Sequence, residues 1–160
     1  MKLLIMRHAK SAFALNGFSD HERPLSDSGR LVVPQIAQKV VELHCEPEVI
    51  YCSDAQRTSE TLELFVPELT KKPQVEFSHD LYQASIQDLI HFIENKNLLC
   101  DTLQIIGHNP TLEALVKYLS GEYRDIQPGN LVILTHDDTT WDRALNQKGS
   151  WQLTEFLSTT

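Results

Sequence analysis

Short apolar runs alternate with longer segments of helical periodicity along this chain, and this alternation limits its fold more than any other feature. The runs are Leu3–Met6, Val49–Cys52, Val75–Phe77, Thr102–Gly107 and Leu131–Thr135. Between them, apolar residues recur at intervals of three and four, which is typical of one face of a helix. Continuous apolar strands are buried on both faces, as in a parallel sheet that helices cover. The sequence therefore predicts a three-layer α/β/α fold with a mostly parallel central sheet.

Residues that favour helix ends mark the boundaries in the first half of the chain. Ser26 is the expected N-cap of the first helix, and Pro34 inside its apolar pattern predicts a kink or a later start. Ser53 or Asp54 is expected to cap the second helix, which Pro67 ends. A long connection, residues 9–25, is left after the first strand, and ordered connections of that length are often functional.

The same signals continue in the second half. Ser85–Asp88 fits a capping box at the start of a third helix. Asn109 is the expected cap of a fourth helix, with Pro110 at its first position and Gly121 at its end. The pattern of Gln152–Leu157 fits either a strand or a helix.

Length and charge exclude several classes of protein. The chain has 160 residues, which predicts a single domain over residues 1–160, and its formal net charge of -8 argues against nucleic-acid or anionic-membrane partners. Its longest apolar runs are too short for a signal peptide or a membrane span. We therefore expect a cytoplasmic, monomeric protein.

Neither the cysteines nor most of the histidines form a recognisable metal motif. Cys45, Cys52 and Cys100 are odd in number and far apart, which favours free thiols over a disulfide framework or a metal site. Five histidines have no supporting sequence context and are expected to be surface or packing residues: His21, His44, His79, His91 and His136.

Polar side chains follow three of the predicted strands. Arg7 and His8 follow the first strand, Arg57 lies in the turn after the second, and His108 and Asn109 follow the fourth. The carboxyl ends of parallel strands share one edge of a sheet, where ligands bind in open α/β folds. The sequence therefore predicts a cleft that holds two arginines and two histidines.

Such a cleft suits a phosphoryl group. Guanidinium groups match phosphate oxygens, and the helix that begins after Asn109 would add backbone N–H donors, so we expect Asn109 beside the substrate. A neutral imidazole nitrogen aimed at phosphorus can act as a nucleophile. No metal is required in that cleft, because the arginines already neutralise the charge of the phosphoryl group.

Four segments resemble the histidine phosphatase superfamily, whose fold is that of phosphoglycerate mutase. Met6–Ala9 resembles its Arg-His-Gly signature, and the continuation Ala9–Ser11 is similar to the small SixA-type phosphohistidine phosphatases. Arg23–Arg30 resembles the "RPL…G" element, Ser53–Thr61 the "S-x-A-x-R-x-x-x-T" turn, and Ile106–Thr111 the second-histidine motif. The segments occur in the family's order over roughly three quarters of the chain.

The resemblance implies a role for each matching residue. His8 would be the nucleophile that carries a transient phosphoryl group, and Arg7 and Arg57 would clamp its oxygens. His108 would donate a hydrogen bond to the same group. Arg23 would bind phosphate or fix the long loop, and water would hydrolyse the phosphoenzyme without any cofactor.

The chain departs from the larger family at the general acid. Many relatives carry a carboxylic acid after the third strand, but residues 78–85 contain no Glu, and Asp80 is the remaining candidate. A phosphoramidate needs less help from an acid, which favours phosphohistidine in a protein as the substrate. A phosphatase of a small phosphorylated metabolite is the alternative of the same fold. A non-catalytic module that binds phosphate or a phosphoprotein is the alternative of another class.

Overall fold

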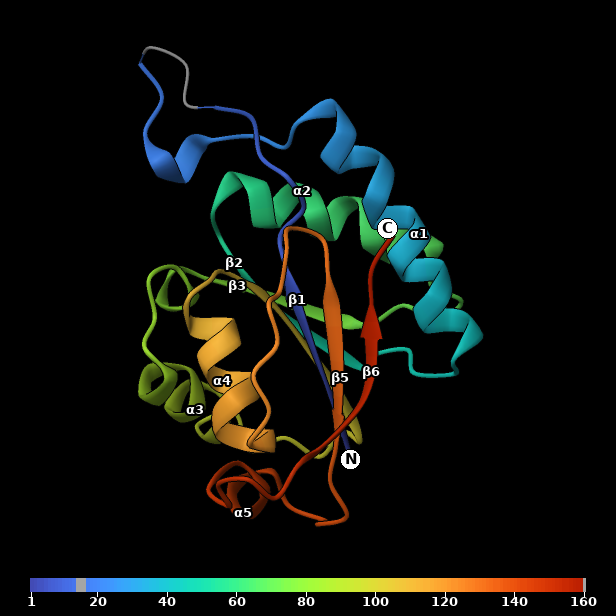
Figure 1. The fold of residues 1–160 in the computed structure, drawn as a ribbon, viewed down its shortest axis with the longest axis vertical. Helices are drawn as coiled ribbons and strands as arrows, with labels where there is room; N and C mark the ends of the chain where they lie inside the picture. Colours follow the sequence, from blue (N-terminus) through green and yellow to red (C-terminus); the bar gives the residue numbers. More distant parts are fainter. Residues whose placement is uncertain (14–16, 160) are drawn as a thin grey trace.

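Six strands form one sheet at the centre of the computed structural model, which describes residues 1–13 and 17–159 (Figure 1). Residues 14–16 of the expected 9–25 connection, and residue 160, lie outside the described part. The strands are β1 (Lys2–Arg7), β2 (Val49–Ser53), β3 (Gln74–Ser78), β4 (Thr102–Gly107), β5 (Leu131–Thr135) and β6 (Gln152–Leu157). Their order is β3-β2-β4-β1-β5-β6; the first four strands pair in parallel, and β5 pairs antiparallel with both β1 and β6. The mostly parallel sheet is confirmed, and the ambiguous segment near the C-terminus is a strand.

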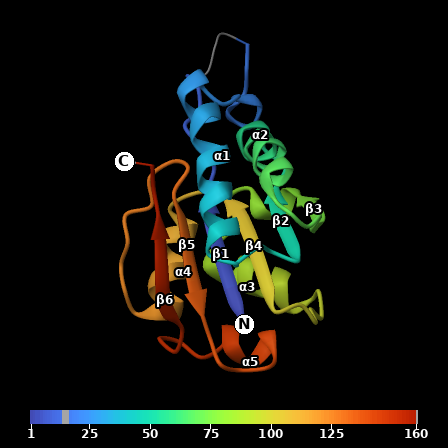
Figure 2. The same ribbon diagram turned by 90° about the vertical axis from the view of Figure 1, so that its right-hand side faces the viewer.

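Helices cover both faces of this sheet (Figure 2). They are α1 (Asp27–Glu42), α2 (Gln56–Phe65), α3 (Ile86–Glu94), α4 (Thr111–Ser120) and α5 (Trp141–Leu145). Within the described residues, short 3₁₀ turns connect other elements: η1 (Asp20–Glu22), η2 (Val66–Glu68) and η3 (His79–Leu81). Helices α1 and α2 pack on one face and α3, α4 and α5 on the other, so the predicted three layers are confirmed.

The alternation of side chains along β1 separates the two cores. Leu3 and Ile5 are buried with α3 and α4, whereas Leu4 and Met6 are buried with α1 and α2. Both sets are fully buried because helices shield both faces of the strand. A central strand clamped on both faces gives a rigid base for the residues that follow it, Arg7 and His8.

In the first half one helix cap differs from the prediction, and of the two alternatives expected at Pro34 the later start is excluded while the kink stays a prediction. The Ser26 side chain accepts a hydrogen bond from Gly29 N at 3.1 Å and caps α1 as predicted, and α1 then runs through Pro34 without a later start. The expected cap of α2 at Ser53 or Asp54 is wrong. The cap position is Ala55, which makes no side-chain capping bond, because the Ser53 side chain turns to another partner.

The start of α4 also differs from the prediction. This helix begins at Thr111, with Pro110 rather than Asn109 at the cap position. The amide of Asn109 is bonded elsewhere, to Glu113 and to the carbonyl of Ile126. Gly121 ends the helix as predicted, in the left-handed conformation with φ of 78°.

Two further expectations concern the cysteines and the membrane. The three cysteines are free thiols, of which Cys45 and Cys52 are buried and Cys100 is partly buried. Among the residues that the structure describes, no helix combines the length and the apolar character needed to cross a membrane.

Candidate active site

The predicted residues converge at the carboxyl edge of the parallel strands. His8 follows β1, His108 follows β4, and Arg57 lies in the first turn of α2, after β2. Strand β4 lies between β1 and β2, so these three positions are neighbours in space although far apart in sequence. The imidazole centroids of His8 and His108 are 5.3 Å apart. Arg57 Nε donates a hydrogen bond to His8 Nε2 over 3.3 Å.

Hydrogen bonds fix the tautomer of His8. Its Nδ1 lies 2.7 Å from the backbone carbonyl of Ala9, which can only accept, so Nδ1 carries the proton. Nε2 therefore holds a free lone pair, which accepts the hydrogen bond from Arg57. The pKa of His8 is lowered to about 4, chiefly because the ring is buried, and the charges of Arg57, Arg7 and Arg23 lower it further. The hydrogen bond to the Ala9 carbonyl acts in the opposite direction and raises the pKa. At neutral pH the ring is uncharged and its Nε2 keeps an unprotonated lone pair.

Arg7 is held by a loop that carries no family motif. Its Nη1 donates to the carbonyl of Ile126 over 3.1 Å. That carbonyl also accepts from the Asn109 amide at 2.9 Å, and Glu113 Oε1 accepts from both Asn109 and the Ile126 amide. Arg7 Nε is buried without a protein partner. The network positions Arg7 and gives Asn109 a structural role, while the expected contact of Asn109 with substrate stays a prediction.

The segment after β2 positions Arg57 and also anchors the loop that follows β1. Thr61 Oγ1 donates to the Arg57 carbonyl over 2.7 Å and accepts from the Ala9 amide over 3.1 Å, which ties α2 to the residue after His8. Arg57 itself is only 7% exposed, so it is not the solvated surface charge that a first-turn arginine usually is. A cation at a helix N-terminus opposes the helix dipole, and the surrounding acceptors compensate for this cost.

His108 is neutral as well. Its Nε2 lies 2.8 Å from Ser53 Oγ, which explains why Ser53 does not cap α2. Burial and then the neighbouring His8 and Arg57 lower the pKa of His108 to about 3. Its Nδ1 is buried without a partner in the protein. An uncharged imidazole can donate one hydrogen bond to a phosphoryl oxygen but is not an acid catalyst at neutral pH.

Asp20, on η1, accepts hydrogen bonds from Arg57 and Arg23, and no sequence pattern predicted these contacts. Arg57 Nη1 donates to the Asp20 carbonyl over 2.8 Å, and Arg57 Nη2 to its carboxylate over 3.2 Å. Tyr82 and Arg23 also donate to that carboxylate. The bonds from Tyr82 and Arg23, with the charge of Arg57, lower the pKa of Asp20 to about 2 in spite of partial burial. An ionised carboxylate therefore lies where a phosphate would meet Arg57.

The remaining predicted residues lie further out. Arg23 fixes the long loop, since its guanidinium donates to the Ala12 carbonyl, to Ser11 and to Asp20. A cavity of about 430 Å³ lies against Arg57, His108 and Asn109, and Asp20 is the carboxylate among its lining residues. Asp80 lines a neighbouring cavity rather than this one, and its role as the general acid stays a prediction.

Two of the histidines that were expected to be surface or packing residues also belong to a cluster. His21 and His79 both bond to the carboxylate of Asp54 at the rim of the site. No sequence pattern links the three residues, because they come from η1, the β2–α2 turn and η3.

Comparisons with known proteins place this site in a family. A sequence profile of the histidine phosphatase superfamily (branch 1) matches residues 3–89, which is over half of the chain. An uncharacterized chloroplastic protein of Arabidopsis thaliana is 28% identical over 163 residues, covering 95% of this chain and 75% of the relative.

Solved structures match nearly the whole fold. A protein of Agrobacterium tumefaciens assigned as the phosphohistidine phosphatase SixA superposes with a TM-score of 0.84 at 22% identity, covering 99% of this chain and 97% of the other. The protein histidine phosphatase SixA in complex with tungstate gives 0.82 at 22% identity, with the same coverage of both chains. These structural matches establish the phosphoglycerate-mutase-like fold.

Proposed function

Because this chain belongs to the histidine phosphatase superfamily (branch 1), we propose that it removes phosphate from phosphohistidine in a protein, through a phosphohistidine intermediate on His8. One observation carries the proposal. The buried His8 ring keeps its proton on Nδ1 and presents the lone pair of Nε2 beside the Arg57 guanidinium. The proposed nucleophile and a cation that can bind phosphate thus lie within hydrogen-bond distance of each other, which is the arrangement that phosphoryl transfer requires.

The first step exchanges one N–P bond for another. The phosphoryl group displaces Asp20 from Arg57, and the lone pair of His8 Nε2 attacks phosphorus. The bond from phosphorus to the substrate nitrogen breaks as the bond to Nε2 forms. Arg57, Arg7 and His108 stabilise the negative charge on the oxygens during transfer.

The second step hydrolyses the phosphoenzyme. Phosphorylated His8 keeps its proton on Nδ1 through the Ala9 carbonyl, so the ring is cationic while it carries the phosphoryl group. Water attacks phosphorus, the N–P bond breaks, and the electron pair returns to Nε2. His8 leaves as a neutral imidazole and inorganic phosphate is released, so this nitrogen needs no proton from another residue.

The acid–base properties of the cavity favour a phosphoramidate as substrate. An alkyl phosphate releases an alkoxide, which needs a proton, whereas a protonated phosphohistidine releases a neutral imidazole. Among the described residues that line the cavity, Asp20 is the carboxylate, and its pKa of about 2 keeps it ionised. His108, with a pKa of about 3, holds no acidic proton at neutral pH either.

Trapping the intermediate tests the proposal. The protein is mixed with a radiolabelled phosphohistidine-containing protein and quenched in alkali, where a phosphohistidine survives and a phosphoserine does not. We expect label on His8, lost in His8→Asn and retained in the control His91→Asn, whose side chain is 69% exposed on α3.

Two other results would point to the alternative functions. Faster turnover of sugar or nucleotide phosphates than of the phosphoprotein would indicate a phosphatase of small metabolites. The absence of turnover and of labelled protein with every substrate, with phosphate binding retained, would indicate a non-catalytic binding module.

A further inference from the structure

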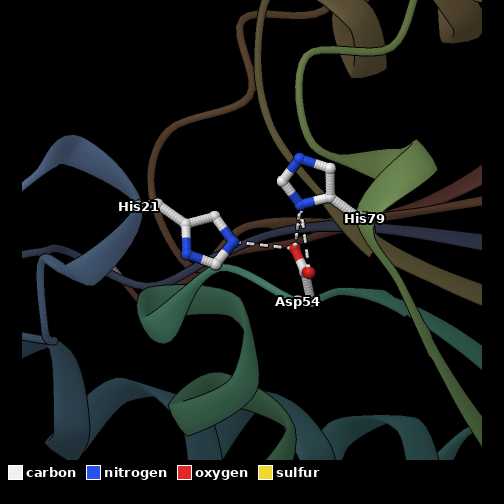
Figure 3. A group of neighbouring side chains, drawn as sticks. All are labelled: His21, Asp54 and His79. Atoms are coloured by element: carbon white, nitrogen blue, oxygen red, sulfur yellow. Dashed lines mark hydrogen bonds and ion pairs between the residues drawn. The ribbon is translucent and has the colours of Figure 1, made fainter.

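Three side chains from separate parts of the chain converge on one point (Figure 3). His21 lies on η1, Asp54 in the turn between β2 and α2, and His79 at the start of η3. His21 Nε2 lies 2.8 Å from Asp54 Oδ1, and His79 Nδ1 lies 3.1 Å from both oxygens of the same carboxylate. One ligand atom from each residue lies within 4.8 Å of the other two.

We propose that His21, Asp54 and His79 bind a Zn²⁺ ion that ties η1 and η3 to the β2–α2 turn. Two imidazole nitrogens and one carboxylate oxygen are a common set of three protein ligands for zinc, with a fourth position left for water. Bond lengths of about 2.0–2.2 Å place tetrahedral ligand atoms roughly 3.3 Å apart. The three groups therefore need only small side-chain movements to reach that geometry.

The site is accessible to an ion from solvent. His21 and Asp54 side chains are each 34% exposed and that of His79 is 72% exposed. The ring of Tyr82 packs edge-on against His21, with centroids 4.8 Å apart, and limits the movement of His21 on its protein side.

Binding the ion requires a change of tautomer in both imidazoles. Without metal, each imidazole donates an N–H to the one carboxylate of Asp54, which then serves two donors. With metal, these nitrogens supply lone pairs, and each ring carries its proton on the nitrogen that points away from Asp54 (Figure 3). The carboxylate keeps its negative charge and binds Zn²⁺ in place of the two N–H groups.

The ion would act on the position of Asp20 and would not contact the phosphoryl group on His8. His21 directly follows Asp20, whose carboxylate bonds to Arg57, and Tyr82 contacts Asp20, His21 and His79. An ion at the cluster would hold η1 against the sheet edge and so keep Asp20 near Arg57. The reacting atoms at His8 Nε2 lie outside the cluster, so the proposed phosphatase chemistry does not pass through the metal.

Metal binding to the full chain, measured without substrate, tests this inference independently of the proposed activity. Isothermal titration with Zn²⁺, and visible absorption with Co²⁺ as a probe of tetrahedral sites, are expected to show one ion per chain. His79→Ala should weaken binding more than about tenfold, since loss even of an outer-shell partner costs about 10–100-fold. Asp54→Asn should weaken it similarly.

The control is His91→Ala, which removes an exposed histidine of α3 outside the cluster. It is expected to bind Zn²⁺ like the unmodified chain, and circular dichroism verifies that each variant is folded. His79 is the most exposed of the three ligands, so its replacement is the least disturbing to the fold. Equal affinity of the unmodified chain and His79→Ala, or equal loss in His91→Ala, would overturn the inference.

Discussion

Acid should destabilise this protein through its two active-site histidines, because the fold keeps both uncharged. The pKa of His8 falls from its usual value of 6.5 to about 4, and that of His108 to about 3. Between these values and pH 6.5 the unfolded chain binds protons that the folded chain does not. The stabilisation that comes from keeping these histidines neutral is therefore fully present above pH 6.5, and it is lost as the pH falls through that window.

The size of the effect follows from the same shifts. Between pH 6.5 and pH 5 each of the two histidines takes up a proton in the unfolded state but not in the folded state. This lowers the free energy of unfolding by about 1.36 kcal/mol per pH unit, or about 2 kcal/mol per histidine. Since His108 is less buried than His8, we expect the free energy of unfolding to fall by about 3–4 kcal/mol between pH 7 and pH 5. Carboxylates titrate mainly below this range and contribute little to the difference.

Urea unfolding at pH 7 and pH 5 measures this loss directly. In His8→Asn the loss should be smaller by about 2 kcal/mol, because only His108 still titrates. The control His91→Asn, an exposed position, should lose as much as the unmodified protein. If His8→Asn and the unmodified protein lose the same stability, His8 is not held neutral by burial and the argument for its nucleophilic state fails.

Three substitutions test other contacts, two of them in the site and one between α1 and the loop after β1. Arg57→Ala should lower kcat about 10²–10³-fold, because it removes a preorganised donor to the transferring group, and single-turnover kinetics would show it; an unchanged rate would exclude Arg57 from the clamp. Asp20→Asn should strengthen binding of inorganic phosphate, measured by calorimetry, because the carboxylate that bonds to Arg57 loses its charge; weaker binding would mean that Asp20 assists the anion. Gly29→Ala should destabilise the fold by about 1–3 kcal/mol in spite of the better helix propensity of Ala, because a Cβ there would lie 2.3 Å from the Lys10 carbonyl oxygen. Leu31→Ala, at an exposed position of the same helix, is its control in thermal unfolding, and similar stability of the two variants would contradict the packing argument.

The sequence alone determined the layers of the fold, the carboxyl edge as the place of the site, and the four residues that meet there. Continuous apolar runs identified the buried strands, and the polar residues that end them marked the edge, since both signals are local in the chain. Helix boundaries at Ala55 and Thr111 were missed because nearby polar side chains have tertiary partners: Ser53 bonds to His108, and Asn109 to Glu113. A capping preference yields when a distant partner competes for the same oxygen or amide.

Only the tertiary structure decided what surrounds those four residues. Asp20 reaches Arg57 across 37 positions, and His21 and His79 reach Asp54 across 33 and 25. Contacts of that kind depend on how a loop lies over a sheet edge, and no periodicity or short motif encodes them. The strand that precedes His8 could be recognised from four apolar residues. The contact of the Asp20 carboxylate with Arg57, and the cluster of His21 and His79 on Asp54, arise from packing between segments that are far apart in the chain.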